Sequence, residues 1–176
     1  MTVTALKTRA KASALSAHRK SADFDFLMGV WRVHHRYLVK RLAGCHDWIE
    51  FGGYVAARHI LDGWGNMDEG PIELPGGHYR GTSLRLYDPA TSKWAIYWLD
   101  SRCPGRLFPP VYGTFEDGPF GPVGTFLGDD AFKGRPIRVR FIWSRITPDS
   151  ARWEQAFSLD EGNTWENNWF MDFTRE

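Results

Sequence analysis

Residues 29–38 read Gly-Val-Trp-Arg-Val-His-His-Arg-Tyr-Leu, and this stretch decides the fold class. Its side chains alternate in character, as they do in a β-strand, where successive residues point to opposite faces. One face is mainly charged and the other is apolar and aromatic. The residues of the second face are Trp31, Val33, His35 and Tyr37. The pattern predicts a strand with one buried side and one side in water.

Short runs rich in β-branched and aromatic residues recur from residue 24 onward, separated by Gly, Pro, Asp and Asn. Short turns join many of these runs, so consecutive strands must pair antiparallel. We expect about ten strands, at residues 29–38, 48–61 with a bend at 52–53, 65–69, 79–87, 94–101, 111–116, 123–127, 137–146, 152–158 and 165–174. Residues 67–78 and 101–110 are rich in Gly and Pro, and we expect them to form long loops.

The faces expected to point inward carry large aromatic side chains together with a few polar ones. The polar members are His35, Tyr37, Gln155 and Asn167. Burying such groups costs free energy unless they are hydrogen-bonded, and water or a ligand in a cavity would satisfy them. We therefore predict an all-β protein, a single closed antiparallel barrel of about ten strands that is wide enough to hold a ligand.

The length and composition fit one folded domain with a separate N-terminal segment. The chain has 176 residues, 43% hydrophobic, 24% charged and 15% aromatic, with 9 Trp spread along it. Residues 1–22 contain five basic residues and no acidic one, and they lack the apolar side chains that would order them. We predict a basic flexible tail at 1–22 and a barrel domain at 23–176.

Charge, hydropathy and cysteine content exclude several classes of protein. The net charge is +1, and most of the positive charge lies in the tail, so the body lacks the basic face that nucleic-acid binding requires. No apolar run approaches the roughly 20 residues of a membrane-spanning helix. The two cysteines, Cys45 and Cys103, form no disulfide or zinc pattern, which favours a cytoplasmic protein with reduced thiols.

The stretch Phe-Leu-Met-Gly-Val-Trp at 26–31 resembles the Gly-x-Trp opening of the calycins, the superfamily of lipocalin-like barrels. In that superfamily the tryptophan begins the first strand and packs across the closed end of the barrel. An arginine near the end of the last strand stacks on it. The resemblance therefore implies a lipocalin-like barrel in which Arg175 stacks on Trp31.

A wider set of motifs is similar to DUF1579, a bacterial calycin family of unknown function. The shared features are the Phe-Leu-x-Gly-x-Trp opening, Leu-Tyr-Asp-Pro at 86–89, Asp-x-Gly-x-Thr-Trp at 160–165, Asn168-Trp169 and the terminal Thr-Arg at 174–175. The resemblance covers residues 24–175. It implies a fold and no established chemistry.

Residues 158–165 also match the Asp-box, Ser-x-Asp-x-Gly-x-Thr-Trp, which recurs in sialidase propellers. A propeller needs one such repeat in each blade, and here the motif occurs once. We therefore interpret it as a hairpin turn in which Asp160 accepts hydrogen bonds from the turn and Gly162 takes a positive φ.

We expect the barrel to bind a small, mainly apolar or aromatic molecule between aromatic side chains, with a few polar groups to orient it. The candidate ligand-binding residues are Trp31, His35, Tyr37, Trp64, Asn66, Trp98, Arg102, Trp153, Gln155, Asn167 and Trp169. Arg102 ends a strand at the expected mouth, where its guanidinium could hold a carboxylate.

Two alternatives stay open. One is a cofactor-independent enzyme of the isomerase or cyclase type, with His35 as acid or base and Tyr37 or Asn167 stabilising developing charge. The other is a structural or interaction protein with a filled core, and a homodimer through a strand edge or the mouth loops is compatible with it. The remaining histidines are scattered, and none lies in a motif for a metal or for haem of the nitrobindin type. We expect no cofactor and no metal.

Overall fold

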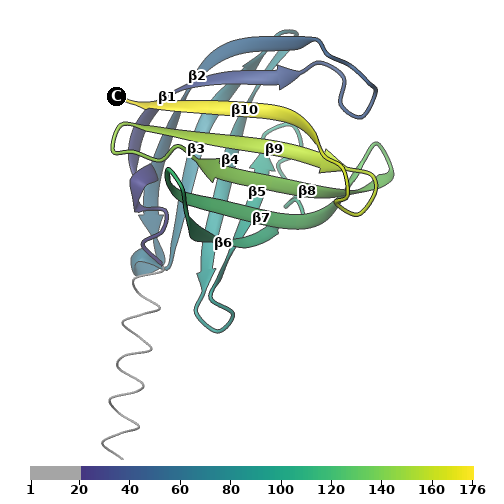
Figure 1. Ribbon diagram of the computed structural model, residues 1–176. Coiled ribbons are helices and arrows are strands. Elements are labelled where there is room, and N and C mark those ends of the chain that lie inside the picture. The colour runs from purple at the N-terminus through teal and green to yellow at the C-terminus, as the bar shows by residue number, and fades with distance from the viewer. Residues whose placement is uncertain (1–20) are drawn as a thin grey trace, which may run out of the picture.

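Ten strands and two short 3-10 turns make up the fold in the computed structural model of the protein, which describes residues 21–176 (Figure 1). The turns are η1 (Asp25–Leu27) and η2 (Leu61–Gly63). The strands are β1 (Gly29–Leu38), β2 (Trp48–Ile60), β3 (Gly65–Leu74), β4 (Gly77–Asp88), β5 (Lys93–Asp100), β6 (Val111–Gly118), β7 (Gly121–Phe132), β8 (Arg135–Ser144), β9 (Ser150–Ser158) and β10 (Glu166–Arg175).

Each strand pairs antiparallel with the next along the chain, and β1 pairs with β10 to close the barrel. The predicted closed antiparallel barrel is therefore confirmed. Of the tail predicted at 1–22, residues 1–20 lie outside the described part of the chain.

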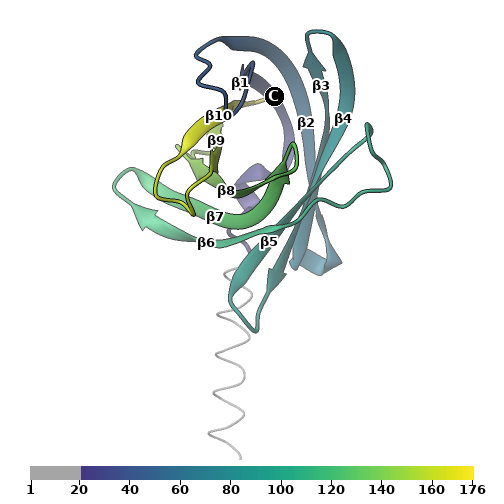
Figure 2. The same cartoon turned by 90° about the vertical axis from the view of Figure 1, so that its right-hand side faces the viewer.

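Buried aromatic side chains, among them Phe24, Trp31, Trp94 and Phe126, pack together as a plug at one end of the barrel. The turn η1 crosses this end (Figure 2). The Arg175 guanidinium lies 4.0 Å from the centroid of the Trp31 ring, and it donates hydrogen bonds to the carbonyl oxygens of Phe26 and Met28, both at 2.7 Å. The Trp31 indole N–H donates to the Leu27 carbonyl at 2.7 Å. The stacking implied by the calycin resemblance is thus present, and these bonds connect η1 to the start of β1 and the end of β10.

The prediction of a long loop at 67–78 is wrong. Strands β3 and β4 pair continuously from Gly65 opposite Leu86 to Leu74 opposite Gly77, with a two-residue turn between them. Gly70 is required there because a Cβ at this position would lie 2.0 Å from a backbone oxygen of β2. Pro71 is tolerated because β3 pairs with β2 only as far as Glu69, so the missing N–H costs no bond on that side.

The Asp-box forms the turn between β9 and β10, as expected from the sequence. The Asp160 carboxylate accepts hydrogen bonds from the Thr164 backbone N–H at 2.8 Å, the Thr164 hydroxyl at 2.6 Å and the Ser158 hydroxyl at 2.7 Å. These bonds, led by that from the Thr164 hydroxyl, lower the pKa of Asp160 to about 2. The motif therefore stabilises a turn at the open end of the barrel.

Candidate functional site

A cavity of about 300 Å³ lies inside the barrel, at the lower end of the range for small-molecule sites. Its wall is mainly apolar, and residues of all ten strands contribute to it. The aromatic members used below are Tyr37, Tyr79, Trp98, Trp153 and Trp169. Ser83 on β4 is one of the small members of the wall. The Trp98 ring packs against the neighbouring Gly81, where a Cβ would lie 2.2 Å from that ring.

The wall is incomplete between β5 and β7. Strand β6 pairs with β5 only at Trp94–Ile96, so the outer half of β5 has no β6 neighbour. The part of β7 after Leu127 likewise pairs with β8 alone. Side chains from both free edges, including Tyr97 and Asp129, line the cavity, and the connection at 101–110 covers the gap with Phe108 and Pro109. The connection at 101–110 therefore completes the cavity wall where strand pairing is missing.

The open end carries two arginines and two tyrosines of the cavity wall. Arg102 lies 3.8 Å above the Tyr79 ring, and its guanidinium donates to both oxygens of Asp100, at 3.0 and 2.7 Å. This bonding lowers the pKa of Asp100 and neutralises Arg102. Arg41, from the β1–β2 connection, lies 4.9 Å from the centroid of the Tyr37 ring. Burial raises the pKa of Tyr79 to about 12, so its phenol stays protonated.

The floor of the cavity holds a buried ion pair. Arg85 donates to the Asp68 carboxylate and, at 3.0 Å, to the Asn66 side-chain oxygen. Only 3% of the Arg85 side chain and 10% of the Asp68 side chain are exposed. The Arg85 guanidinium also lies over the rings of Phe24 and Trp143, at 5.1 and 5.6 Å. Because the two charges cancel, the floor presents a polar but neutral surface.

The expectation that Asn167 faces inward with Trp169 is wrong. A β-bulge interrupts the pairing of β10 with β9, so Asn167 lies opposite Ala156 and Trp169 opposite Gln155, with Asn168 inserted between them. Asn167 is consequently exposed, whereas Asn168 is buried. The Asn168 side-chain oxygen accepts a hydrogen bond from the Gln155 amide at 2.8 Å. The bulge thus supplies a buried partner for Gln155 in the cavity wall.

His35 lies on the inner face of β1 as expected, but it does not line the cavity. Its ring stacks on Phe51, with centroids 4.5 Å apart and planes at 6°, and it is fully buried. The Trp169 indole N–H donates to its Nδ1 at 3.2 Å, which places the ring proton on Nε2. Burial, with a smaller contribution from His34, lowers the pKa of His35 to about 4. His35 is therefore a neutral buried group that orients Trp169.

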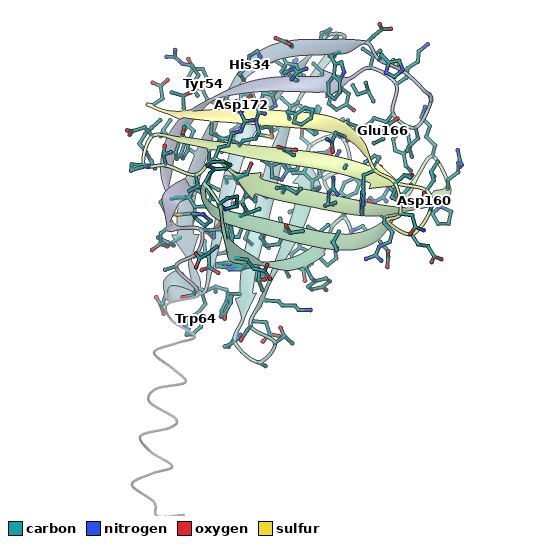
Figure 3. The ribbon with its side chains drawn as sticks, in the orientation of Figure 1. His34, Tyr54, Trp64, Asp160, Glu166 and Asp172 are labelled. Atoms are coloured by element: carbon teal, nitrogen blue, oxygen red, sulfur yellow. The ribbon has the colours of Figure 1, made fainter. Side chains whose placement is uncertain are left out.

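The other candidates divide between the cavity wall and the closed end. Tyr37, Trp98, Arg102, Trp153, Gln155 and Trp169 all line the cavity. Trp31 belongs to the plug, and Trp64 packs on Tyr87 at the end of the barrel opposite Asp160 (Figure 3). Asn66 is buried and is not part of the wall, and its side-chain oxygen accepts a hydrogen bond from Arg85, which does line the cavity. The structure therefore brings six of the eleven candidates together.

Sequence reasoning missed several polar residues of the wall. Tyr79, Ser83 and Arg85 share the inner face of β4, and alternation along that strand was the signal that could have found them. Asp68 was hidden by the expectation of a loop at 67–78. Arg41 lies in a connection, where no periodicity indicates which way a side chain points.

Within residues 21–176, no group of three or more His, Cys, Asp or Glu side chains is placed to bind a metal. No helix in this part of the chain is both long and apolar enough to cross a membrane. The fold and site thus define a closed β-barrel with an aromatic, ligand-sized cavity. The sequence matches no protein-family model, and a search of the curated proteins found no match.

Proposed function

We propose that the protein binds one small, mainly apolar or aromatic molecule inside the barrel. The observation that carries this proposal is the cavity of about 300 Å³, which is lined by aromatic rings and has polar side chains at its floor and its open end. Aromatic walls supply most of the affinity of such a site, and a few convergent polar groups supply its selectivity.

The two alternatives have less support in the structure. An enzyme that uses His35 as acid or base needs that ring beside its substrate, but His35 is fully buried and is not part of the cavity wall, which Trp169, its hydrogen-bond partner, does line. A protein with a filled core would leave no space of this size between its inner faces. A homodimer stays a prediction, and it is compatible with ligand binding.

The proposal includes membership of the calycin superfamily, with DUF1579 as the nearest family. The support is the stacking of Arg175 on Trp31 at the closed end, together with the ordered motifs of the sequence. It also includes a cytoplasmic location, which the two free cysteines, Cys45 and Cys103, favour.

Filling the cavity is expected to abolish binding without unfolding the barrel. Ser83 is a small inward-facing member of the wall, so Ser83→Phe places a ring in the empty space. We expect the affinity for 1-anilinonaphthalene-8-sulfonate, an aromatic anion, to fall at least about tenfold, which corresponds to about 1.4 kcal/mol. Fluorescence titration measures this affinity, and circular dichroism checks the fold.

The matched control is Thr82→Phe, because Thr82 directly precedes Ser83 on β4 and is not part of the cavity wall. This variant adds the same ring outside the barrel and should bind the dye as the wild type does. Equal affinities in the wild type and in Ser83→Phe would contradict binding inside the cavity.

A further inference from the structure

The charges of the cavity wall are not equally available to a ligand. Three arginines line the cavity within residues 21–176, and two of them are neutralised by carboxylates. Arg85 pairs with Asp68 at the floor, and Arg102 pairs with Asp100 at the open end. Arg41 has no ion pair and no hydrogen bond to any other residue in this part of the chain. It is therefore the one wall cation in the described residues that is free to bind an anion.

Aromatic rings hold the Arg41 guanidinium in place from more than one side. Its central carbon lies 4.9 Å from the Tyr37 and Phe132 ring centroids and 5.4 Å from that of Phe157. Cation–π contacts orient the guanidinium without using its N–H donors, which lie in its own plane. Three rings from β1, β7 and β9 thus present a fixed fork of donors at the open end of the cavity.

Two phenol groups add neutral donors beside this cation. The hydroxyls of Tyr37 and Tyr79 have no hydrogen-bond partner within residues 21–176, and both residues line the cavity. Neither acidic residue of the adjacent β7 wall forms an ion pair with Arg41: Asp129 pairs with Arg138 at 3.2 Å, and Asp130 accepts from the Ala131 backbone N–H at 2.7 Å. The open end therefore combines one unpaired cation with two hydroxyl donors.

We infer that Arg41, with the Tyr37 and Tyr79 hydroxyls, binds the carboxylate of an amphipathic acid whose apolar body fills the barrel. A carboxylate accepts two parallel hydrogen bonds from the fork of an arginine, and a second pair of lone pairs remains for phenol donors. A ligand bound with its carboxylate at the cavity floor is unfavourable, because the Arg85–Asp68 pair has no net positive charge to compensate that buried carboxylate. This inference rests on the proposed function, since it names the ligand class of the same cavity.

The test compares two probes of the same shape, 2-naphthylacetate and the neutral 2-naphthylacetamide, by titration calorimetry at pH 7. The wild type should bind the acid at least about tenfold more tightly than the amide, as expected for a charged hydrogen-bonded pair. Arg41→Gln should remove that preference and leave the affinity for the amide unchanged. Arg41→Lys, which keeps the charge but loses the fork, should retain a preference of about threefold.

Arg106→Gln is the matched control, because Arg106 also stacks on an aromatic ring, that of Phe108 at 4.4 Å, but is exposed and does not line the cavity. It should bind both probes as the wild type does. Equal binding of acid and amide by the wild type, or an unchanged preference in Arg41→Gln, would overturn the carboxylate site and leave the proposed function standing. Failure of the wild type to bind either probe would overturn both.

Discussion

Arg85→Met is expected to lower the free energy of unfolding by about 3–5 kcal/mol, as is usual when one partner of a buried ion pair is removed. The substitution leaves the Asp68 carboxylate buried at the cavity floor without its cation, and it removes the donor to Asn66. Urea denaturation at pH 7 measures the loss. Adding Asp68→Asn to Arg85→Met should recover about 2 kcal/mol, because the uncompensated charge is then absent.

The matched control uses the exposed ion pair of the same two strands. Arg80 and Glu69 lie on the outer face of β4 and β3, with N and O 2.6 Å apart, and their side chains are 60% and 47% exposed. Arg80→Met should cost less than about 1 kcal/mol, because water screens an exposed pair. Similar losses in Arg85→Met and Arg80→Met would contradict the description of the cavity floor as a desolvated ion pair.

The wild-type protein is expected to lose about 2–3 kcal/mol of stability through His35 as the pH falls from 6.5 to 4.5. The folded state lowers the pKa of His35 from 6.5 to about 4, so the unfolded chain takes up its proton first on acidification. The stabilisation is therefore complete well above pH 6.5, and it is lost progressively as the pH falls from 6.5 to about 4. Denaturant titrations between pH 7 and pH 4.5 measure it.

His35→Gln keeps an acceptor for the Trp169 indole and has no titrating ring, so the stability of this variant should be nearly constant over the same range. Hydrogen bonds from Arg102 and Arg152 lower the pKa values of Asp100 and Asp172, so these carboxyl groups stay ionised in the folded state over this range. His34→Gln is the control, because His34 is exposed on the opposite face of β1. If the stability of His35→Gln falls with pH as much as that of the wild type, the pH dependence belongs to another group.

The fold could be predicted from the sequence because strand alternation is a local signal that a barrel repeats many times. The inner faces of β1, β8 and β9 follow directly from their sequences. The second half of β3, after the strand predicted at 65–69, escaped prediction because Gly70 and Pro71 usually mark a loop. The close approach of β2 that requires the glycine is a tertiary feature.

The candidate site was harder to predict, because facing inward and lining a cavity are different properties. His35 and Trp31 face inward as expected, yet neighbouring rings cover them. The bulge at Asn168 turns the Asn167 side chain to the outer face of β10, and nothing in the local sequence indicates a bulge at that position. Arg102 pairs with Asp100, whereas Arg41 has no ion pair among the described residues. Both arginines lie in connections between strands, and no sequence periodicity predicts the conformation of such segments.

Native mass spectrometry tests the central claim, one ligand inside each barrel, most directly. After incubation with 2-naphthylacetate, the wild type and Thr82→Phe should each carry one molecule of the acid per chain. Ser83→Phe, whose added ring occupies the cavity, should show the mass of the bare protein. A bare wild type, or the same adduct in Ser83→Phe as in Thr82→Phe, would contradict ligand binding in the barrel cavity.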